Sequence, residues 1–307
     1  MSEKPFAPGY IKLLSEGRLA EKVKQGKQLL ASCNCCGWRC KVDRRTEKLG
    51  VCLSGVTARV NSYGPHLGEE DVLRGWRGSG TIFFSRCNLR CQFCQNHEIS
   101  QANTGKPVLA EDLAEIMLDL QDYGCHNINL VSPTHVAPQI LAAVHISARK
   151  GLHLPLVWNT GGYDSLALLE LLEGVVDIYM PDMKYANPSV ALHYSKIPHY
   201  PQTNQAAVKE MHRQVGDLVI DAQGLAQRGL LVRHLVLPDK LSGTQAVMQF
   251  LATEVSPNTY INIMGQYHPD WRADSFPKLK RSITKREHEE ALQIAREAGL
   301  YRGDRLN

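Results

Sequence analysis

The chain has 307 residues, of which 43% are hydrophobic and 21% charged, and its formal net charge is +4. These values are ordinary for a globular protein of one large or two smaller domains, and the mild basic charge does not require a nucleic-acid partner. The first residues contain no apolar core, and no run of about 18 apolar residues occurs, so we expect neither a signal peptide nor a membrane span. Nine cysteines in such a chain predict metal or redox use in a reducing, cytoplasmic compartment.

Residues 1–75 are predicted to form a helical, cysteine-rich, metal-binding extension. Cys33, Cys36, Cys40 and Cys52 have the spacing C-x2-C-x3-C-x11-C, and Cys35 is an extra thiol. Four thiolates in so short a segment can close a tetrahedral site, and soft thiolates suit both zinc and an auxiliary iron–sulfur cluster. The basic residues beside them either offset thiolate charge or form an ordinary solvated face: Arg39, Lys41, Arg44, Arg45 and Lys48.

Short apolar runs then alternate with helical patterns. The predicted strands are 81–85, 127–132, 155–160, 177–184, 230–238 and 259–265, and the predicted helices are 109–123, 137–150, 165–172, 205–215, 244–255 and 285–298. This alternation indicates βαβ units and a parallel sheet, so we expect an α/β fold over residues 76–270, followed by a tail and helix over 271–307. The pattern permits a partial (β/α)6 barrel or a doubly wound sheet, and both gather ligands at the carboxyl ends of the strands. Residues 186–203 are predicted to be a surface loop with a short helix, the alternative being a lid or substrate-facing excursion.

Three cysteines follow the first predicted strand in the run Cys87-Asn-Leu-Arg-Cys91-Gln-Phe-Cys94. Four-iron clusters take four thiolates, so a set of three leaves one iron without a protein ligand. An open coordination position is typical of a metal centre that acts on a bound molecule. The alternative is a zinc knuckle with His97 as the fourth ligand, which the C-x3-C spacing disfavours.

This motif, with the aromatic Phe93 before its last cysteine, resembles the cluster motif of the radical S-adenosylmethionine (radical SAM) superfamily. The resemblance implies a partial (β/α)6 barrel and a catalytic [4Fe-4S] cluster on the three cysteines, with Phe93 in the cofactor site. It also implies S-adenosylmethionine at the open iron and an electron donor such as flavodoxin or ferredoxin. Reductive cleavage of the cofactor would yield methionine and a 5′-deoxyadenosyl radical, which abstracts hydrogen.

A closer resemblance is to the pyruvate formate-lyase-activating-enzyme-like branch of that superfamily. The segments that carry it are 64–70, 78–85, 94–100, 159–163, 177–185, 233–238 and 262–269. The branch is named for activators of glycyl-radical enzymes, so a glycyl-radical enzyme is an implied partner. The name is an analogy and does not identify a substrate.

Polar residues end the second and third predicted strands. Ser132 and Thr134 stand where many activating enzymes carry a Gly-Gly-Glu motif, which holds the cofactor's amino group. Either residue could take the place of that motif. Alternatively, Thr134 could cap the next helix. Asn159 and Thr160 could hydrogen-bond a ribose or a carboxylate. The following Gly161-Gly162 pair predicts a close backbone approach to a ligand, or a plain turn.

Charged residues end the fourth and fifth predicted strands. Asp182 and Lys184 point the same way on an extended chain, and Asp-x-Lys resembles a cofactor-contacting motif of the activating enzymes, although a structural ion pair is the alternative. Arg233 stands in an apolar strand and is expected to face a carboxylate. The resemblance to the activating enzymes implies that it lies near the cofactor. Asn262 and the run Gln266-Tyr267-His268-Pro269 are candidates for the substrate side.

The sequence therefore predicts a radical SAM enzyme that activates a glycyl-radical enzyme or modifies another small molecule or macromolecule. The alternative from a different class is a non-catalytic zinc protein that grips nucleic acid through the basic segment 39–48. Only Trp38 offers a stacking aromatic there, so nucleic acid is a disfavoured partner.

Overall fold

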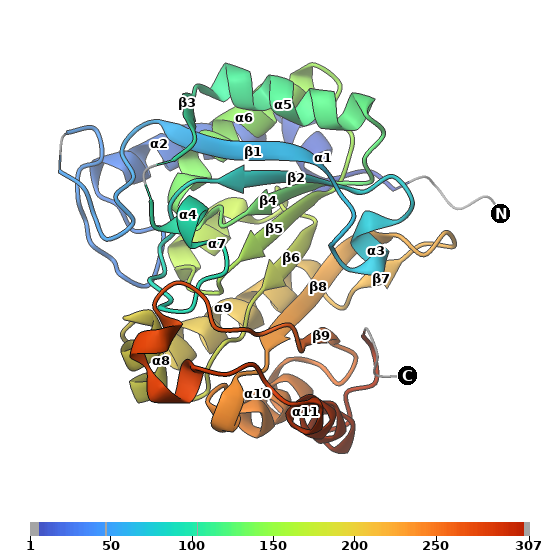
Figure 1. Cartoon of the computed structure of the whole chain (residues 1–307). Helices are drawn as coiled ribbons and strands as arrows, with labels where there is room; N and C mark the ends of the chain where they lie inside the picture. The colour runs from blue at the N-terminus through green and yellow to red at the C-terminus, as the bar shows by residue number, and fades with distance from the viewer. Residues whose placement is uncertain (1–5, 47, 103, 304–307) are drawn as a thin grey trace.

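The computed structural model describes residues 6–46, 48–102 and 104–303. Within them, one sheet holds the strands β1 (Ala58–His66), β2 (Ser79–Phe84), β3 (Lys106–Val108), β4 (Ile128–Val131), β5 (Leu156–Thr160), β6 (Ile178–Pro181), β7 (Val219–Ile220), β8 (Ala226–Leu235) and β9 (Tyr260–Met264) (Figure 1). The helices are α1 (Gly9–Ser15), α2 (Arg18–Ala31), α3 (Asp71–Arg74), α4 (His97–Ser100), α5 (Ala110–Asp122), α6 (Ala137–Arg149), α7 (Leu166–Leu172), α8 (Pro188–Ser195), α9 (Tyr200–Val215), α10 (Thr244–Phe250) and α11 (Lys285–Glu297).

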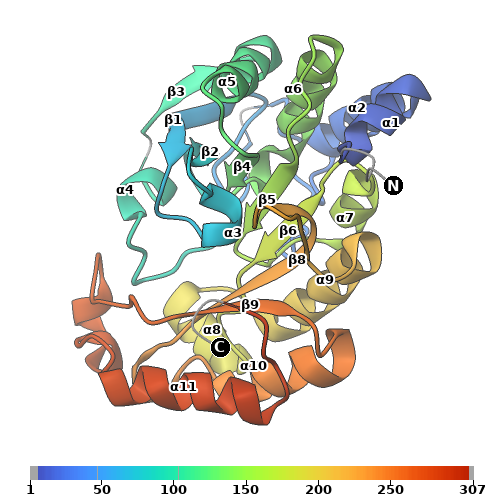
Figure 2. The same cartoon turned by 90° about the vertical axis from the view of Figure 1, so that its right-hand side faces the viewer.

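The α/β partial barrel is confirmed. The strands β2, β4, β5, β6, β8 and β9 pair in that order, and every one of these pairings is parallel. They correspond to the six predicted strands. The helices follow an arc along the outside of the curved sheet (Figure 2). In the described chain β9 pairs only with β8, so the barrel does not close.

Antiparallel strands at one edge were missed from the sequence. β1 pairs antiparallel with β2 on one side and β3 on the other. Its sequence, Ala-Arg-Val-Asn-Ser-Tyr-Gly-Pro-His, contains Gly and Pro and is largely exposed, so it has no apolar run to signal a buried strand. β1 lies inside the predicted extension 1–75 yet belongs to the sheet, and the domain boundaries at 75 and 270 remain predictions.

Several helices differ from their predicted bounds. α9 begins at Tyr200 and not at residue 205, because Pro201 occupies its first turn, where a missing N–H costs nothing. The prediction over 244–255 covers two segments: α10 ends at Phe250 and a π-helical turn, Leu251–Val255, follows. Within 186–203 the short helix is α8.

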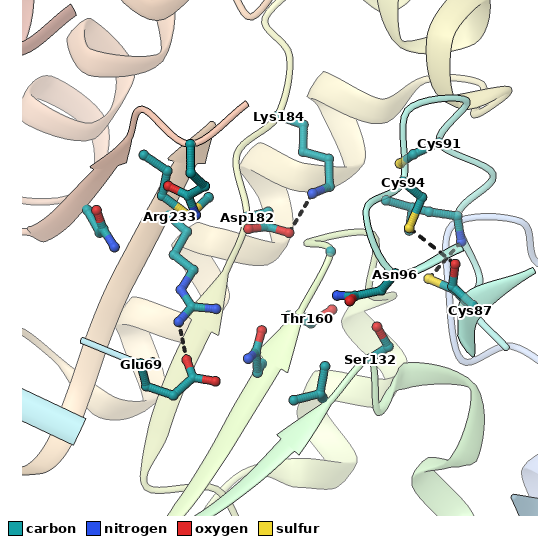
Figure 3. Close-up of a pocket in the computed structure, with 18 of the residues that line it drawn as sticks. Glu69, Cys87, Cys91, Cys94, Asn96, Ser132, Thr160, Asp182, Lys184 and Arg233 are labelled. Atoms are coloured by element: carbon teal, nitrogen blue, oxygen red, sulfur yellow. Dashed lines mark hydrogen bonds and ion pairs between the residues drawn. The ribbon is translucent and has the colours of Figure 1, made fainter. Parts of the chain in front are cut away.

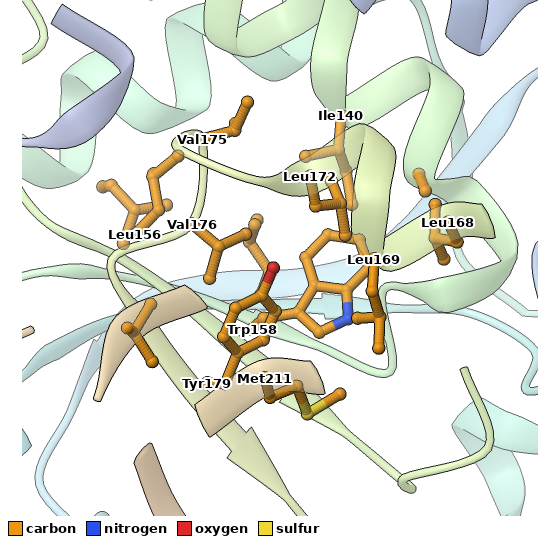
Figure 4. Close-up of a cluster of buried hydrophobic side chains, with 14 of the residues drawn as sticks. Ile140, Leu156, Trp158, Leu168, Leu169, Leu172, Val175, Val176, Tyr179 and Met211 are labelled. Carbon is orange, nitrogen blue, oxygen red and sulfur yellow. The ribbon is translucent and has the colours of Figure 1, made fainter. Parts of the chain in front are cut away.

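The main core lies between the sheet and its outer helices. Trp158 on β5 and Tyr179 on β6 are fully buried and pack against the leucines of α7, beside Ile140 of α6 and Met211 of α9 (Figure 4). The Trp158 indole Nε1 donates to Asp164 Oδ1 at 3.1 Å, so its one polar group is satisfied. This layer fixes the outer face of the strands whose ends form the site.

Among the described residues, no helix combines the length and the apolar character that a membrane crossing needs.

Truncating a buried side chain of α7 should lower the free energy of unfolding much more than truncating an exposed side chain of the same helix. Leu169 of α7 is 0% exposed, whereas Leu166 is 47% exposed. We expect Leu169→Ala to lower the free energy of unfolding by about 2–5 kcal/mol, because a cavity adds to the lost transfer energy. Leu166→Ala should change it by no more than ~0.5 kcal/mol. Urea denaturation of both variants measures this, and equal effects would contradict the assigned core.

Candidate active site

A cavity of about 640 Å³ lies at the carboxyl ends of the parallel strands, a size typical of ligand pockets. Eleven of the candidate side chains proposed from the sequence line it: Cys87, Cys91, Cys94, Ser132, Asn159, Thr160, Asp182, Lys184, Arg233, Asn262 and Gln266. Figure 3 shows the cysteines on one side and Arg233 on the other, with the Asp182–Lys184 pair between them. Residues from all six parallel strands, or from the loops that follow them, are therefore brought together around one space.

The three cysteines lie on the loop between β2 and α4. Cys91 accepts a hydrogen bond from Ser195 Oγ at 3.0 Å, Cys94 lies 3.2 Å from Ser100 Oγ, and the Leu89 amide donates to Cys87 at 3.4 Å. Burial raises the pKa of the Cys91 thiol to about 12 and also raises that of Cys87. A bound iron would replace these protons, since coordination deprotonates a thiol outright.

The zinc-knuckle alternative gains no support from the position of His97. Its ring lies 3.3 Å from Asp270 Oδ1 and stacks on Trp271, and it does not line the cavity. Among the described residues, no three His, Cys, Asp or Glu side chains are arranged to hold a single metal ion. In a four-iron cluster each thiolate binds its own iron, so the cysteines need not converge on one point.

Asp182 and Lys184 form a close ion pair inside the cavity. Lys184 Nζ lies 2.6 Å from Asp182 Oδ2, and both side chains are less than one-fifth exposed. Burial alone would lower the pKa of Lys184, but its interactions with Asp182 and Cys91 outweigh burial and raise it above the ordinary value. A fixed positive charge therefore faces the cysteine side of the cavity.

Tyr200 and Asn204 at the start of α9 hold this pair in place. The Tyr200 hydroxyl accepts from the Lys184 amide at 3.1 Å and lies within hydrogen-bond distance of the carbonyls of Gly161 and Asp182. The Asn204 amide donates to the carbonyls of Gly162 and Asp182, each at 2.9 Å. The ends of β5 and β6 are thus joined by side chains from the outer helix.

The Gly161-Gly162 pair lets the loop after β5 pack closely against neighbouring parts of the protein. A Cβ on Gly161 would come 2.8 Å from Leu89 of the cysteine loop, and one on Gly162 would meet the Asp182 carbonyl oxygen at 2.3 Å. Gly162 also has a φ of +72°, which side chains disfavour. The close approaches found in the structure are to neighbouring loops.

Arg233 faces carboxylates, as expected, but they belong to the protein. Its guanidinium donates to both oxygens of Glu70, at 2.7 and 2.5 Å, and also pairs with Glu69. The Asn262 amide donates to Glu70 at 2.8 Å. Burial alone would raise the pKa of Glu70, but Arg233 and Asn262 hold it below its ordinary value.

Thr134 and Thr160 belong to a buried hydrogen-bond network around Asp164. Their hydroxyls donate to Asp164 at 2.9 and 2.7 Å, so Thr160 has no proton left for a ligand, although it lines the cavity. Thr134 is 1% exposed and does not line the cavity. The prediction that Thr134 caps the next helix is wrong, because a 3₁₀ turn, Thr134–Val136, precedes α6 and the N-cap is Val136.

Phe93 and Ser132 occupy different positions relative to the cavity. Phe93, within the cysteine loop, is 4% exposed, packs edge-on against Tyr267 at 5.8 Å between ring centroids, and does not line the cavity. Ser132 lines the cavity with a φ of +55°, an uncommon conformation for a residue other than glycine. Its amide donates to the Asn159 carbonyl at 2.8 Å, which fixes this bend beside β5.

Sequence reasoning gave no role to several cavity residues. His66, Glu69 and Glu70 come from β1 and the loop after it, and Asn96 and Gln101 flank α4. The adjacent Glu69 and Glu70 stood in a segment noted for resemblance alone. The signal that could have found Glu70 was the unpaired Arg233 of an apolar strand, but its partner lies 163 positions away.

Comparison with known proteins identifies the superfamily of the chain. The model of the radical SAM superfamily matches residues 81–221, which include the cysteine loop and strands β4 to β6. An uncharacterized protein of Methanocaldococcus jannaschii, MJ0674, is 32% identical over 289 residues, covering 91% of this chain and 78% of that protein. The chain belongs to the radical SAM superfamily.

The similar solved structures are distant. The [FeFe]-hydrogenase maturase HydG is 12% identical with a TM-score of 0.49, over 71% of this chain and 49% of HydG. Streptococcus suis SuiB, bound to the precursor peptide SuiA, is 12% identical with a TM-score of 0.48, over 71% of this chain and 46% of SuiB. AdoMet-bound anSMEcpe is 10% identical with a TM-score of 0.47, over 69% of this chain and 57% of anSMEcpe. The chain thus spans about half the length of these structures.

Radical SAM enzymes use a [4Fe-4S] cluster, S-adenosylmethionine and an electron donor, and the cavity fits the first two. Soft thiols on one wall are the ligand type that iron–sulfur clusters prefer. Beyond them lie Lys184, the Ser132 hydroxyl and the Asn159 amide, which suit a polar cofactor with a carboxylate and an amino group.

Breaking the Arg233–Glu70 pair should strongly destabilise the protein. Their side chains are 15% and 1% exposed, so Arg233→Met leaves a buried carboxylate without its cation. We expect a loss of about 3–5 kcal/mol in the free energy of unfolding, and a smaller loss when Glu70→Gln is added. Because the folded pKa of Glu70 is lowered, the pair's stabilisation is present above the ordinary glutamate pKa and is lost as pH falls.

Urea unfolding at neutral pH measures both variants. Arg213→Met is the matched control, because Arg213 pairs with Glu210 on the surface and is 56% exposed. It should cost no more than ~1 kcal/mol. If Arg233→Met costs no more than this control, the pair does not organise the cavity.

Proposed function

We propose that this radical SAM protein holds a catalytic [4Fe-4S] cluster on Cys87, Cys91 and Cys94 and cleaves S-adenosylmethionine reductively. The observation that carries the proposal is the meeting of three thiols, a fixed cation and several amide and hydroxyl groups in one cavity. When bound and reduced, a cluster held by Cys87, Cys91 and Cys94 would supply the electron for reductive cleavage of the sulfonium and so the means of hydrogen abstraction from a substrate.

The proposed cofactor-binding residues have distinct tasks. Lys184 balances the negative charge of the cluster thiolates, and Asp182 orients Lys184. Ser132 and Asn159 contact the methionine end of the cofactor, in place of a Gly-Gly-Glu motif. Arg233 acts with Glu69 and Glu70 on the opposite side of the cavity.

Three further residues support the site through buried contacts. Phe93 anchors the cysteine loop, to which it belongs, through its contact with Tyr267. Thr134 and Thr160 anchor Asp164, and so hold the loop after β5 in position. Their proposed role is to position the cofactor-binding residues.

For the substrate, the proposal is a glycyl-radical enzyme whose glycine enters the cavity, with a flavodoxin or ferredoxin as electron donor in the cytoplasm. The resemblance to the activating-enzyme branch supports this choice, with Asp182, Lys184 and Arg233 at the cavity. Radical modification of another small molecule or macromolecule is the second candidate. A second metal, zinc or an auxiliary cluster, is proposed at Cys33, Cys36, Cys40 and Cys52.

Removing the cysteine triad should abolish cofactor cleavage. Protein purified without oxygen, reconstituted with iron and sulfide and reduced with dithionite is expected to convert S-adenosylmethionine to 5′-deoxyadenosine. Cys87→Ala, Cys91→Ala and Cys94→Ala together should end this conversion and lower the iron content by about four per chain. The Cys125→Ser variant is the control, since Cys125 is buried near β4 and away from the cavity. No product from wild type, with iron unchanged in the triple variant, would refute the proposal.

Removing the cavity cation should weaken the cofactor reaction but retain the cluster. Lys184→Met removes a charge-assisted interaction worth about 1.5–3 kcal/mol, which corresponds to a loss of roughly 10-fold to 150-fold in kcat/KM for S-adenosylmethionine. Lys196→Met is the control, because Lys196 is exposed on the loop after α8. Initial rates of 5′-deoxyadenosine formation decide, and equal rates for the two variants would exclude a role for Lys184.

A further inference from the structure

The cysteine-rich segment brings four thiols close together. Cys36 interacts electrostatically with Cys33, Cys40 and Cys52, and Cys40 does so with Cys33 and Cys52. Cys33, Cys36 and Cys52 are buried. Their backbone lies outside the helices and strands, so the segment has little regular structure of its own to hold the thiols in place.

A buried arginine beside these thiols lacks a carboxylate partner. Arg44 is 1% exposed and donates to the carbonyls of Ser54 and Gly55, at 3.0 and 2.8 Å. Its third nitrogen, Nη1, has no hydrogen-bond partner among the described residues, where Arg44 also forms no ion pair. It lies against Cys33 and Cys35, with which it interacts electrostatically.

Burying a cation costs several kcal/mol unless a negative charge balances it. A tetrathiolate metal centre is negatively charged overall, and would place anionic sulfur against the guanidinium. The buried guanidinium of Arg44 thus favours negatively charged sulfur beside it, an observation that supports a thiolate centre and does not depend on the cysteine spacing.

The same segment is bonded directly to the loop of the catalytic cysteines. Trp38 Nε1 donates to the Asn88 carbonyl at 2.7 Å, and Arg90 donates to the Val51 carbonyl. Asn88 and Arg90 lie between the cysteines of the triad. The Gly37 amide donates to the Tyr163 carbonyl at 3.1 Å, which joins the segment to the loop after β5 as well.

We infer that Cys33, Cys36, Cys40 and Cys52 hold a thiolate-bound metal centre, balanced by the buried Arg44, that fixes the loop carrying the catalytic triad. This inference rests on the second metal of the proposed function. It adds the cation that balances the charge of that metal site and a structural role for the site. The four thiols do not already surround a single ion. A cluster, with one iron for each thiolate, demands less convergence of the sulfur atoms, whereas a zinc ion requires rotation of the cysteine side chains.

The first test measures the metal without the catalytic cluster. The full chain carrying Cys87→Ala, Cys91→Ala and Cys94→Ala is purified without oxygen, and zinc, iron and acid-labile sulfide are measured. We expect about one zinc per chain, or iron and sulfide in equal amounts. Adding Cys36→Ser and Cys40→Ser should remove this metal, while adding Cys125→Ser should not. A triad-free chain without stoichiometric metal would overturn the inference.

Since the chain with the two added serine substitutions can fail to fold, a second measurement keeps the test decisive. The triad-free chain is produced in cobalt-supplemented cells, and the bands of cobalt–thiolate coordination are sought in its absorption spectrum. Their presence supports the site and their absence, in a chain that also lacks iron and zinc, refutes it. Neither measurement involves S-adenosylmethionine, so the outcome is independent of whether the protein cleaves it.

The tethering role is tested with Trp38→Phe, which keeps the ring and removes the donor to Asn88. One hydrogen bond is worth about 1 kcal/mol, so iron should leave the triad about 5-fold faster in the presence of a chelator. The metal of the N-terminal site should be unchanged, and the thermal midpoint should fall by no more than about 2–4 °C. Equal rates of iron loss in wild type and Trp38→Phe would show that the segment does not fix the triad loop.

Discussion

The active site depends on the parallel pairing of β6 with β8, which places opposite charges on neighbouring strand ends. Asp182 and Arg233 form a parallel bridge beyond the regular pairing, and the Met183 amide donates to the Arg233 carbonyl at 2.8 Å. Lys184 and Glu70 then satisfy these two charges on their other sides. An unpaired charge at such depth is strongly unfavourable. Each of the five charged groups in the cavity accordingly contacts one of opposite sign: Asp182, Lys184, Arg233, Glu69 and Glu70.

The cysteine loop is held from several directions, which suits a site that must position a cluster precisely. Leu89 packs against Gly161 of the β5 loop, and Ser195 at the end of α8 donates to Cys91. Arg90 reaches both Gln101 and the cysteine-rich segment. The loop has little secondary structure, so these contacts with four other parts of the chain define its conformation.

Much of the fold could be predicted from the sequence because its signals are local. Each parallel strand is a short apolar run, and the triad has a fixed spacing directly after one of them. β1 could not be found in this way, since an exposed edge strand with Gly and Pro has no apolar pattern. The partners of Arg233 were equally inaccessible: the chain brings Glu69 and Glu70 to it from the far edge of the sheet.

The side-chain roles were harder to predict than the strand positions. Asp182 and Lys184 share one face of an extended segment, so their meeting follows from a period of two. In the sequence, by contrast, nothing distinguishes Thr134 and Thr160 from exposed polar residues at a strand end. Only the tertiary structure shows that both hydroxyls are committed to Asp164, which is fully enclosed and pairs with the Trp158 indole as well.

The central claim is that one iron at the Cys87–Cys91–Cys94 site lacks a protein ligand and binds S-adenosylmethionine. The most direct measurement is the electron paramagnetic resonance spectrum of the reduced, reconstituted protein with and without S-adenosylmethionine. We expect a reduced [4Fe-4S] signal whose g values change when the cofactor is added, and no such change when the three cysteines are replaced. A signal that is identical with and without the cofactor, or that persists unchanged without the three cysteines, would contradict the account.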